Sequence, residues 1–422
     1  MSKGFIFNSG KCVSCGACSA ACNLYNGWET RPRNIYTYIK QLPTETSVLN
    51  ISLACNHCEN AACMEGCPSG ALARDDQNGG ILLDDTKCLG CRYCQWTCPF
   101  DAPKFNSGKR VIEKCNLCHD STDELPSCTT ACPTGALRFI ELTERERDNF
   151  PDWFPGKKLK PSLGLTMDSP KPLEIVPSGA FKQNEIKPAV KSRGNDWSLI
   201  IFSFISMIAV AMQASSFITG TFYGVLFIVL PLTAAAISLF HLGKPLRAWR
   251  ALFNPASSPL SREILFFILF ASLSLSATTL QSTVLSLASA ISGIGLLIVI
   301  DSVYIKPDRK AFLHSGQTFI SSLLLIAYFS GNLLPFTFIV ILKAVLSAVK
   351  MKENNMQALR FLRIAVLFVI WAGLFSGFAE TSLPLTFLII AAELLDRYLF
   401  YIDFRPENIN WHTAKYINDS TL

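Results

Sequence analysis

Histidine is scarce in this chain of 422 residues, and cysteine is confined to its first third. There are five histidines and 16 cysteines, and no cysteine follows Cys132. Charged residues make up 17% of the chain and the net charge is +6, so no nucleic-acid partner is expected. No apolar run of the kind found in a secretory leader follows Met1, which argues against the disulfide framework of a small secreted protein.

The cysteines form four groups of four with short C-x2-C spacings. The groups are Cys12, Cys15, Cys18 and Cys22; Cys55, Cys58, Cys63 and Cys67; Cys88, Cys91, Cys94 and Cys98; and Cys115, Cys118, Cys128 and Cys132. Three thiolates of a C-x2-C-x2-C loop surround one cubane iron-sulfur cluster, and the fourth cysteine of such a group binds the neighbouring cluster. The four groups therefore predict four 4Fe-4S clusters.

Because the fourth cysteine crosses to a neighbour, the groups should also pair. We expect the first group to pair with the last, and the two middle groups to form a second module inserted between them. The repeat of Cys-Pro-Ser-Gly-Ala-Leu at 67–72 as Cys-Pro-Thr-Gly-Ala-Leu at 132–137 supports this arrangement. The predicted ligand sets are Cys12, Cys15, Cys18 and Cys132; Cys115, Cys118, Cys128 and Cys22; Cys55, Cys58, Cys63 and Cys98; and Cys88, Cys91, Cys94 and Cys67.

Zinc is the other metal to consider for these cysteines. Zinc sites favour separated pairs of C-x2-C knuckles, and four cysteines within eleven residues do not fit that pattern. His57 and His119 lie inside cysteine groups, but each predicted cluster already has four thiolates. Both histidines are therefore expected to lie beside a cluster or at the surface, and not to bind metal.

From about residue 197 the sequence consists of long apolar runs that are almost free of charge. They predict eight membrane spans, because buried helices of a soluble protein would need an implausibly large core. The predicted spans are 197–219, 222–240, 264–280, 283–301, 311–330, 333–350, 361–379 and 382–400.

The sequence thus predicts an α+β ferredoxin-like N-terminal domain with four cubane clusters, followed by an all-α polytopic membrane domain of eight transmembrane helices. The expected boundaries are 1–140 for the cluster domain and 197–404 for the membrane anchor. The segment 141–196 contains seven prolines and is interpreted as a mostly extended connector, and 405–422 as a tail.

The loops between the spans alternate in charge. Lysines and arginines follow the second, fourth and sixth spans, and an excess of such residues marks the cytoplasmic side. Both chain ends share the side of these loops. The cluster domain is therefore expected on the cytoplasmic side of the inner membrane, with co-export beside a leader-bearing partner as the exception. The basic residues are Lys244, Arg247, Arg250, Arg262, Lys306, Arg309, Lys310, Lys350, Lys352, Arg360 and Arg363.

The loop that leaves the second span carries His241, and Glu263 begins the third span. Quinol oxidation releases two protons with two electrons, so it needs a proton acceptor beside the quinone oxygens. Histidine titrates near neutral pH and can bond a quinone oxygen, which makes His241 the candidate base and Glu263 the candidate relay. Lys244, Arg247 and Arg262 are candidate quinone-binding residues. Arg247, Arg250 and Arg262 could equally bind lipid headgroups and set the orientation of the spans, and His241 could cap a helix end.

Lys343 is the only lysine well inside a predicted span, and an intramembrane charge is a functional candidate by default. Snorkelling to the cytoplasmic surface is the alternative for Lys343. Glu393, Asp396 and Arg397, near the end of the eighth span, are expected to pair with one another. The spans contain no paired histidines for a haem, and only His314 lies near a span end.

Both halves resemble one known family. Residues 4 to about 140 resemble the iron-sulfur subunit of the dimethyl sulfoxide reductase family of molybdopterin enzymes. The loop from His241 to Glu263 and the eight spans resemble that family's membrane anchor, here on the same chain. The resemblance implies that menaquinol binds near His241 and that electrons pass through four clusters to a separate molybdopterin subunit. It also implies roles for His241 and Glu263 in quinol binding and proton handling.

Other functions stay open at this stage. The segments Cys55–Cys58 and Cys91–Trp96, and the fusion itself, also resemble relatives that oxidise sulfite and reduce quinone, so the same relay can run in reverse. A subunit coupled to ion translocation would place Lys343 and Glu393 on a proton path, but the spans look nearly bare of the polar residues that such a path needs. A purely structural anchor is disfavoured because no cluster ligand is missing.

Overall fold

The computed structural model describes most of the chain. Only the first part of the predicted connector is described. The basic residues at 306, 309, 310 and 352 lie outside the described residues. The described residues are 2–41, 46–144, 150–151, 154–166, 197–221, 224–304, 313–351, 356–376, 382–404, 409 and 412–413.

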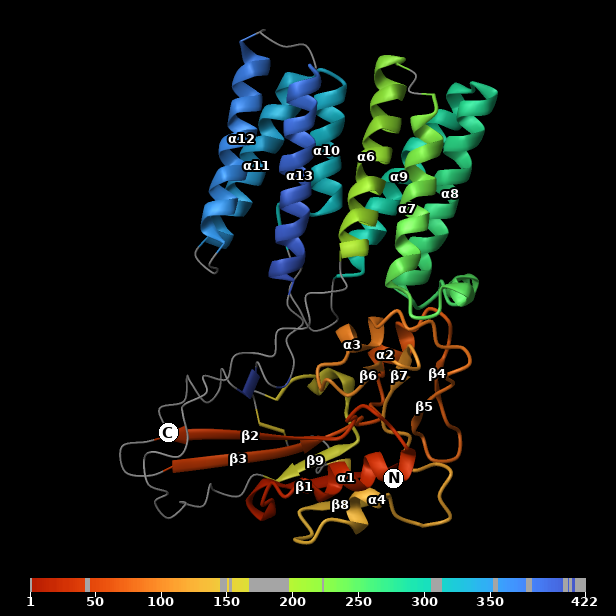
Figure 1. Ribbon diagram of the computed structural model, residues 1–422, viewed down its shortest axis with the longest axis vertical. Helices are drawn as coiled ribbons and strands as arrows, with labels where there is room; N and C mark the ends of the chain where they lie inside the picture. The colour runs from red at the N-terminus through yellow and green to blue at the C-terminus, as the bar shows by residue number, and fades with distance from the viewer. Residues whose placement is uncertain are drawn as a thin grey trace. The chain divides into compact units, whose positions relative to one another are not determined.

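The chain divides into two compact units (Figure 1). The first comprises Met1–Lys191, Leu246–Ser257 and Pro406–Leu422, and the second comprises Ser192–Pro245 and Ser258–Arg405. The first unit therefore includes a short segment from the middle of the predicted anchor and the predicted tail.

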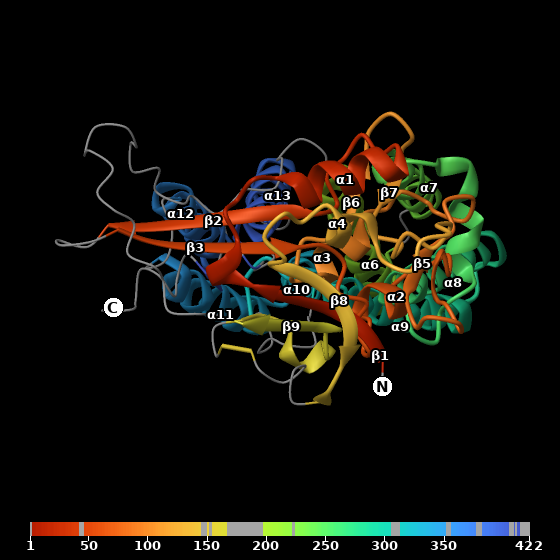
Figure 2. The same ribbon diagram turned by 90° about the horizontal axis from the view of Figure 1, so that it is seen from below.

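A three-stranded sheet lies at the base of the first unit. Its central strand β1 (Ser2–Asn8) pairs antiparallel with β8 (Leu137–Leu142) and parallel with β9 (Leu163–Thr166), as Figure 2 shows. Phe5 and Phe139 lie opposite each other on β1 and β8, and their ring centroids are 5.0 Å apart. The sheet therefore holds the beginning of the cluster region against its end.

The described part of this unit also contains three antiparallel hairpins and four short α-helices. The hairpins join β2 (Asn34–Gln41) to β3 (Thr46–Leu53), β4 (Leu72–Arg74) to β5 (Ile81–Leu83), and β6 (Lys104–Asn106) to β7 (Val111–Glu113). The helices are α1 (Ala17–Asn26), α2 (Ala62–Glu65), α3 (Tyr93–Thr97) and α4 (Ser127–Thr130).

The core of the first unit also contains a residue from the far end of the chain. Ile409 is fully buried in the same apolar cluster as Phe5, Phe7 and Leu137. The backbone N–H of Ile409 donates to the carbonyl oxygen of Pro99 at 2.8 Å. The segment predicted as a tail therefore contributes to the core beside the first and last cysteine groups.

Eight α-helices are described in the second unit. In this part of the chain they run side by side (Figure 1). They are α6 (Trp197–Thr219), α7 (Leu226–Ser238), α8 (Pro259–Leu280), α9 (Thr283–Ser302), α10 (Thr318–Phe329), α11 (Leu333–Met351), α12 (Gln357–Phe375) and α13 (Leu383–Asp403).

Several predicted spans begin at different residues in the structure, and the third and fifth spans differ most. Helix α8 starts at Pro259, five residues before the predicted start at 264, because the Ser258 side chain accepts a hydrogen bond from Ser261 N and Pro259 suits the first turn. Helix α10 starts only at Thr318, because the Asp301 carboxylate accepts from the backbone N–H groups of Thr318 and Phe319 and caps the helix there.

Four of these helices are long and apolar enough to cross a membrane within the described residues, namely α6, α8, α9 and α12. The number rises to five if Leu226–His241 and the bent continuation Pro245–Leu252 count as one span. Helices α10 and α11 are apolar over shorter stretches. Helix α13 carries several charges along its length, which lowers its apolar character.

Helix α6 connects two groups of helices. It packs against α7 and α9 of one group and against α10 and α13 of the other. Close packing depends on Gly293 of α9, because an added Cβ there would lie 2.9 Å from Val210 and 3.0 Å from Phe270. Small residues permit this kind of close helix approach in membranes.

The structure corrects two expectations about buried charge. Lys343 is fully buried and donates to Glu393 and Asp396, so snorkelling to a surface is wrong. Glu393, Asp396 and Arg397 do not pair with one another. The two carboxylates bond Lys343, whereas Arg397 donates to Ser203 and to the Gly316 carbonyl oxygen.

Candidate functional site

The four cysteine groups share one backbone feature. In each group the residue two positions after the first cysteine has a left-handed conformation, with φ of 54° at Ser14, 44° at His57, 67° at Gly90 and 60° at Leu117. Three of these residues are not glycine, and such conformations cost roughly 1–2 kcal/mol in an L-residue. Left-handed turns aim successive N–H groups into one concavity that suits an anion. The Gly90 N–H donates to Cys88 Sγ at 3.4 Å.

Short helices follow these loops and bring separate groups together. Helix α1, which carries Cys18 and Cys22, packs against α4, which carries Cys128. Helix α2, which carries Cys63, packs against α3, which carries Cys94. The first group thus lies against the last, and the second against the third.

The electrostatic neighbours of individual thiols follow the predicted ligand sets. Burial raises the pKa of Cys12, and the thiolates of Cys18, Cys132 and Cys15 raise it further. Burial raises the pKa of Cys22 to about 12, where Arg33 opposes the shift and Cys128 and Cys118 add to it. In both cases the neighbours include cysteines of the group at the other end of the cluster region.

The two middle groups also each contribute one cysteine to the other group. Burial raises the pKa of Cys58, with further contributions from Cys55, Cys98 and Cys63. Burial also raises the pKa of Cys91 to about 12, with contributions from Cys67 and Cys88. We name the four arrangements by one member: the Cys12 set (Cys12, Cys15, Cys18, Cys132), the Cys22 set (Cys22, Cys115, Cys118, Cys128), the Cys55 set (Cys55, Cys58, Cys63, Cys98) and the Cys67 set (Cys67, Cys88, Cys91, Cys94).

Arg33 is buried among thiolates of the first two sets. Burial opposes its charge, but Cys128, Cys115, Cys18 and Cys22 outweigh this and raise the pKa of Arg33. Arg33 Nη1 donates to Ser52 Oγ at 3.3 Å, whereas its Nε and Nη2 atoms are buried and make no hydrogen bond within the described residues. A buried cation with two unused donors fits a site for an iron-sulfur cluster, whose sulfur atoms accept hydrogen bonds.

Lys114 occupies a similar position beside the Cys55 set. Burial opposes its charge, but the thiolates of Cys55, Cys63 and Cys115 raise the pKa of Lys114. Its Nζ donates to the Cys115 carbonyl oxygen at 2.9 Å. Neither Arg33 nor Lys114 was identified from the sequence. The position of Lys114 directly before Cys115 could have indicated its role. Arg33 lies outside the cysteine groups, so no sequence pattern links it to a cluster.

The histidines within the cysteine groups differ from each other. His57 is buried, and its Nδ1 accepts a hydrogen bond from Ile81 N at 2.9 Å. Burial, together with the charges of Lys114, Arg33 and Arg74, lowers the pKa of His57 well below its usual range. His119 is exposed, with its Nδ1 3.9 Å from Asp75 Oδ2. Within the described residues, no three His, Cys, Asp or Glu side chains converge on a site for a single metal ion.

The sets follow one another in a linear order. Cys128 of the Cys22 set has Cys18 of the Cys12 set among its electrostatic neighbours. Cys115 of the Cys22 set likewise has Cys55 as a neighbour, and the two share an apolar cluster with Ala54 and Ala102. Cys94 of the Cys67 set has Cys63 of the Cys55 set as a neighbour. The order is therefore Cys12, Cys22, Cys55 and Cys67.

The segment Leu246–Ser257 contacts the last of these sets. Arg247, on the 3-10 helix η4 (Pro245–Leu252), donates from Nη1 to the carbonyl oxygens of Asp85 at 2.7 Å and Cys88 at 3.1 Å. Asn254 Nδ2 donates to the carbonyl oxygen of Cys67 at 2.9 Å. Arg247 was predicted to bind quinone, whereas in the structure it bonds the backbone at Asp85 and at Cys88 of the Cys67 set.

The other predicted quinone-site residues lie in the second unit. His241 is half-buried at the end of the 3-10 helix η3 (Leu239–His241), and Lys244 is half-buried three residues later. Glu263 is buried in the first part of α8, whereas the adjacent Arg262 is exposed. The charges that act on Glu263 are those of Arg397 and Asp301.

Two family models match parts of the sequence. Residues 46–142 match a 4Fe-4S dicluster domain, and residues 194–283 match the DMSO reductase anchor subunit. The electron transfer subunit PhsB of thiosulfate reductase from Salmonella typhi is 36% identical over 143 residues, which are 32% of this chain and 74% of the relative. This protein belongs to the dimethyl sulfoxide reductase family of iron-sulfur subunits. In this family member the iron-sulfur part and the anchor are fused.

Further family members show the range of substrates. A polypeptide of the anaerobic dimethyl sulfoxide reductase from Escherichia coli K12 is 36% identical over 153 residues, which are 33% of this chain and 74% of the relative. A polypeptide of the sulfite dehydrogenase from Allochromatium vinosum is 32% identical over 179 residues, which are 34% of this chain and 75% of the relative. The expectation of an electron-transfer part joined to a membrane anchor is thus confirmed.

Proposed function

We propose that this protein carries electrons between menaquinol in the membrane and a separate molybdopterin-containing catalytic subunit. In this proposal the four cysteine sets hold four 4Fe-4S clusters, which would supply one-electron carriers when bound. The linear order of the sets supports a relay whose ends are the Cys67 set and the Cys12 set. Relatives named as electron-transfer or reductase subunits support the catalytic partner.

The hydrogen bonds of Arg247 and Asn254 to the Cys67 set carry the proposal. Both side chains come from the segment Leu246–Ser257, which begins five residues after His241. This segment lies within the match to the anchor family. We infer that the Cys67 set exchanges electrons with the quinone, and that the Cys12 set faces the molybdopterin partner.

In the quinol reaction, His241 and Glu263 handle protons. Oxidation of one quinol to quinone releases two electrons and two protons. His241 accepts one proton while bonding the quinol oxygen, because an imidazole titrates near neutral pH. In this proposal Glu263, a buried residue in the second turn of α8, passes a proton on. Lys244 and Arg262 are the proposed donors to the quinone oxygens.

We also propose that all eight helices cross the inner membrane and that the cluster half lies on the cytoplasmic side. The excess of lysine and arginine in alternate loops supports this orientation. The connector 141–196 and the tail 405–422 keep their predicted boundaries in this proposal. A reporter fused after Leu422 is expected to be active only in the cytoplasm, and activity only in the periplasm would overturn the orientation.

Iron analysis tests the number of clusters. Four cubanes require about 16 iron atoms per chain, by four irons each. Acid-labile sulfide should be present in the same amount. An iron content near eight in anaerobically purified protein would contradict the proposal of four clusters.

Quinol-dependent reduction of the clusters tests the membrane site. His241→Ala should abolish reduction by a menaquinol analogue and leave the iron content and the chemically reduced spectrum intact. His119→Ala is the matched control, because His119 is an exposed histidine of the cluster half. Unchanged quinol kinetics in His241→Ala would exclude that residue from the site.

The similarity to a sulfite dehydrogenase polypeptide supports a second direction for the same relay. In that direction electrons leave the catalytic partner and reduce quinone. The assembled complex should be assayed with sulfite and a quinone, and separately with menaquinol and dimethyl sulfoxide. The faster reaction identifies the physiological direction.

A further inference from the structure

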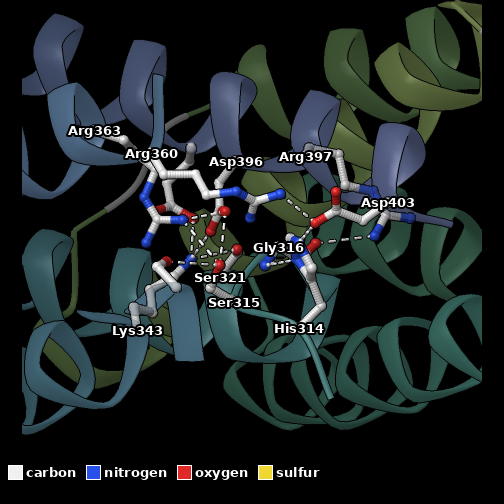
Figure 3. A network of polar contacts seen from close by, with 12 residues as sticks. His314, Ser315, Gly316, Ser321, Lys343, Arg360, Arg363, Asp396, Arg397 and Asp403 are labelled. Atoms are coloured by element: carbon white, nitrogen blue, oxygen red, sulfur yellow. Dashed lines mark hydrogen bonds and ion pairs between the residues drawn. The ribbon is translucent and has the colours of Figure 1, made fainter. Parts of the chain in front are cut away.

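The second unit contains a buried ionic network that the proposed electron relay does not use (Figure 3). Lys343 of α11 lies at its inner end. Its Nζ donates to Glu393 Oε2 at 2.5 Å, to Ser321 Oγ at 2.7 Å and to Asp396 Oδ2 at 3.1 Å. Lys343, Glu393 and Asp396 are all fully buried. One ammonium group therefore bridges two carboxylates of α13 and a hydroxyl of α10.

Asp396 continues the network toward the start of α10. Its second oxygen, Oδ1, forms an ion pair with Arg363 Nη1 of α12 and accepts from Ser315 Oγ at 2.8 Å. Arg363 Nη1 also donates to Ser315 Oγ at 3.0 Å, and Ser347 Oγ donates to the same hydroxyl at 3.2 Å. Polar groups from four helices and one loop thus meet around Asp396.

The outer end of the network is formed by His314, Arg360 and Asp403. Both His314 Nε2 and Arg360 Nη2 bond Asp403 Oδ2, the histidine nitrogen at 3.0 Å. Because His314 Nδ1 accepts from Gly316 N at 2.8 Å, its proton is assigned to Nε2, which donates to Asp403. His314 is adjacent in sequence to Ser315, so the two ends of the network meet in this loop.

Several atoms of the network have unused hydrogen-bonding capacity. Glu393 Oε1, Arg363 Nε and Nη2, and Arg360 Nε are buried and make no hydrogen bond within the described residues. Leaving such a group unsatisfied costs about 1–3 kcal/mol, and more when it is charged. Internal water satisfies groups of this kind where several polar partners surround it. The gaps between these hydrogen bonds are thus places for water, and Glu393 Oε1 is the innermost acceptor.

Apolar side chains close the network beyond Glu393. By helix geometry, Leu324 and Leu325 of α10, Ile389 of α13 and Ile370 of α12 lie about one to two turns beyond Ser321, Glu393 and Arg363, and each of the four is fully buried. Further along the helices, among the residues that the structure describes, Tyr328 bonds Thr386 and Trp371 bonds Thr337. From Asp403 to Glu393 helix α13 rises about 15 Å, roughly half of a ~30 Å hydrocarbon layer.

We propose that Glu393 is a proton-exchanging site, reached through Asp396, Ser315, Arg363, His314 and Asp403 from one end of the helices and closed at the other. Lys343 and Arg363 balance the charges of Glu393 and Asp396 in the ionised state. Uptake of one proton from water converts the Glu393 carboxylate to a carboxyl group and adds one positive charge to the network, and no electron moves. Helices α10 to α13 then hold a proton without conducting it across the membrane.

The arrangement is poorly explained as a structural clamp alone. Replacing a buried ion pair by apolar residues is often neutral or stabilising, so buried charges are costly ways to hold helices together. In a membrane the cost is greater, and ionisable residues inside spans are usually functional. A clamp would also use both oxygens of Glu393, whereas one of them bonds no described residue.

Infrared difference spectroscopy of the full-length protein in lipid nanodiscs tests the site directly. Acidification from neutral pH should produce the carbonyl stretching band of a protonated carboxyl group, and this band should shift in heavy water. Glu393→Gln should lose the band. Tyr328→Phe is the matched control, because Tyr328 lies beyond the apolar layer, and its spectrum should keep the band.

The wild-type measurement decides the question even if Glu393→Gln does not fold. Absence of any exchangeable carboxyl band over the pH range in which the protein stays folded would overturn the proposal. Retention of the full band in a folded Glu393→Gln protein would also overturn it. Quinol-dependent cluster reduction should persist in Glu393→Gln, so failure of this proposal is distinguishable from failure of the proposed electron relay.

Proteoliposomes test the closed end. With a potassium diffusion potential imposed, the proton flux of vesicles containing the protein should equal that of empty vesicles. A protein-dependent proton flux that Glu393→Gln abolishes would show a path across the membrane and would overturn the closed arrangement.

Discussion

Arg247 donates a hydrogen bond from its guanidinium Nη1 to the backbone carbonyl oxygen of Cys88 at 3.1 Å. Burial raises the pKa of the Cys88 thiol, and the positive charge of Arg247 opposes part of that shift. A positive group beside a cluster ligand favours the reduced cluster, because reduction adds negative charge. Arg247 therefore favours electron arrival at the Cys67 set.

We expect Arg247→Ala to lower the reduction potential of the cluster at the Cys67 set by about 30–60 mV, where 59 mV is a tenfold change for one electron. Potentiometric titration followed by electron paramagnetic resonance measures this shift. Arg250→Ala is the matched control, because Arg250 lies on the same 3-10 helix and stacks on Trp249 at 4.9 Å. An equal shift in both variants would contradict a specific role for Arg247.

Removal of the buried cation at Arg33 should weaken the pair formed by the Cys12 and Cys22 sets. Arg33→Leu leaves the thiolates of Cys18, Cys22, Cys115 and Cys128 without their counter-charge, and breaking a buried charge pair costs about 3–5 kcal/mol. We expect loss of about half of the iron on purification, measured as iron per chain. Arg31 is exposed, so Arg31→Leu is the control, and this variant should keep its full iron content.

The left-handed turn at Gly90 is the basis of a third prediction. Gly90 has a φ of 67°, and a side chain there costs roughly 1–2 kcal/mol. Gly90→Ala should make the cluster at the Cys67 set bleach at a lower temperature than the other clusters, as followed by visible absorption. Gly373→Ala should not change bleaching, because its Cβ would make only ordinary contacts at 3.7 Å.

Truncation of Ile409 tests the contribution of the last segment to the cluster half. Ile409→Ala removes a fully buried side chain, and such changes cost about 2–5 kcal/mol. The first unit should unfold at lower denaturant concentration, as measured by loss of cluster absorption. Ile298→Ala provides the comparison, because Ile298 on α9 is 53% exposed and should leave that transition unchanged. Identical transitions in the two variants would count against this packing.

Cysteine spacing predicted an iron-sulfur half, which the match to a 4Fe-4S dicluster domain confirms, because a cluster restricts which cysteines can lie close together. The crossing of Cys22 and Cys132 between groups followed from the same restriction, and the electrostatic neighbours support it. Arg33 could not be found this way. Its position depends on the hairpin β2–β3 and on Ser52, which are tertiary features without a spacing rule.

The membrane half was harder to predict. Apolar runs located the helices, and Lys343 stood out as a charge inside a span. Its partners were missed because positions 393, 396 and 397 share one face of a helix, and that pattern suggests pairing within the helix. In the structure these side chains point to neighbouring helices instead. No spacing rule brings His314 and Asp403 together either, because they are far apart in sequence and meet only through the packing of the helices.

The burial of Ile409 beside Phe5 and Leu137 has a consequence for the order of synthesis. A ribosome makes the cluster half first, but one piece of its core emerges only after the last helix has been made. Until then the region around the first and last cysteine groups lacks a buried side chain and the hydrogen bond to Pro99. The packing of this part of the cluster half is therefore completed only after all the helices that precede Ile409 have been synthesised.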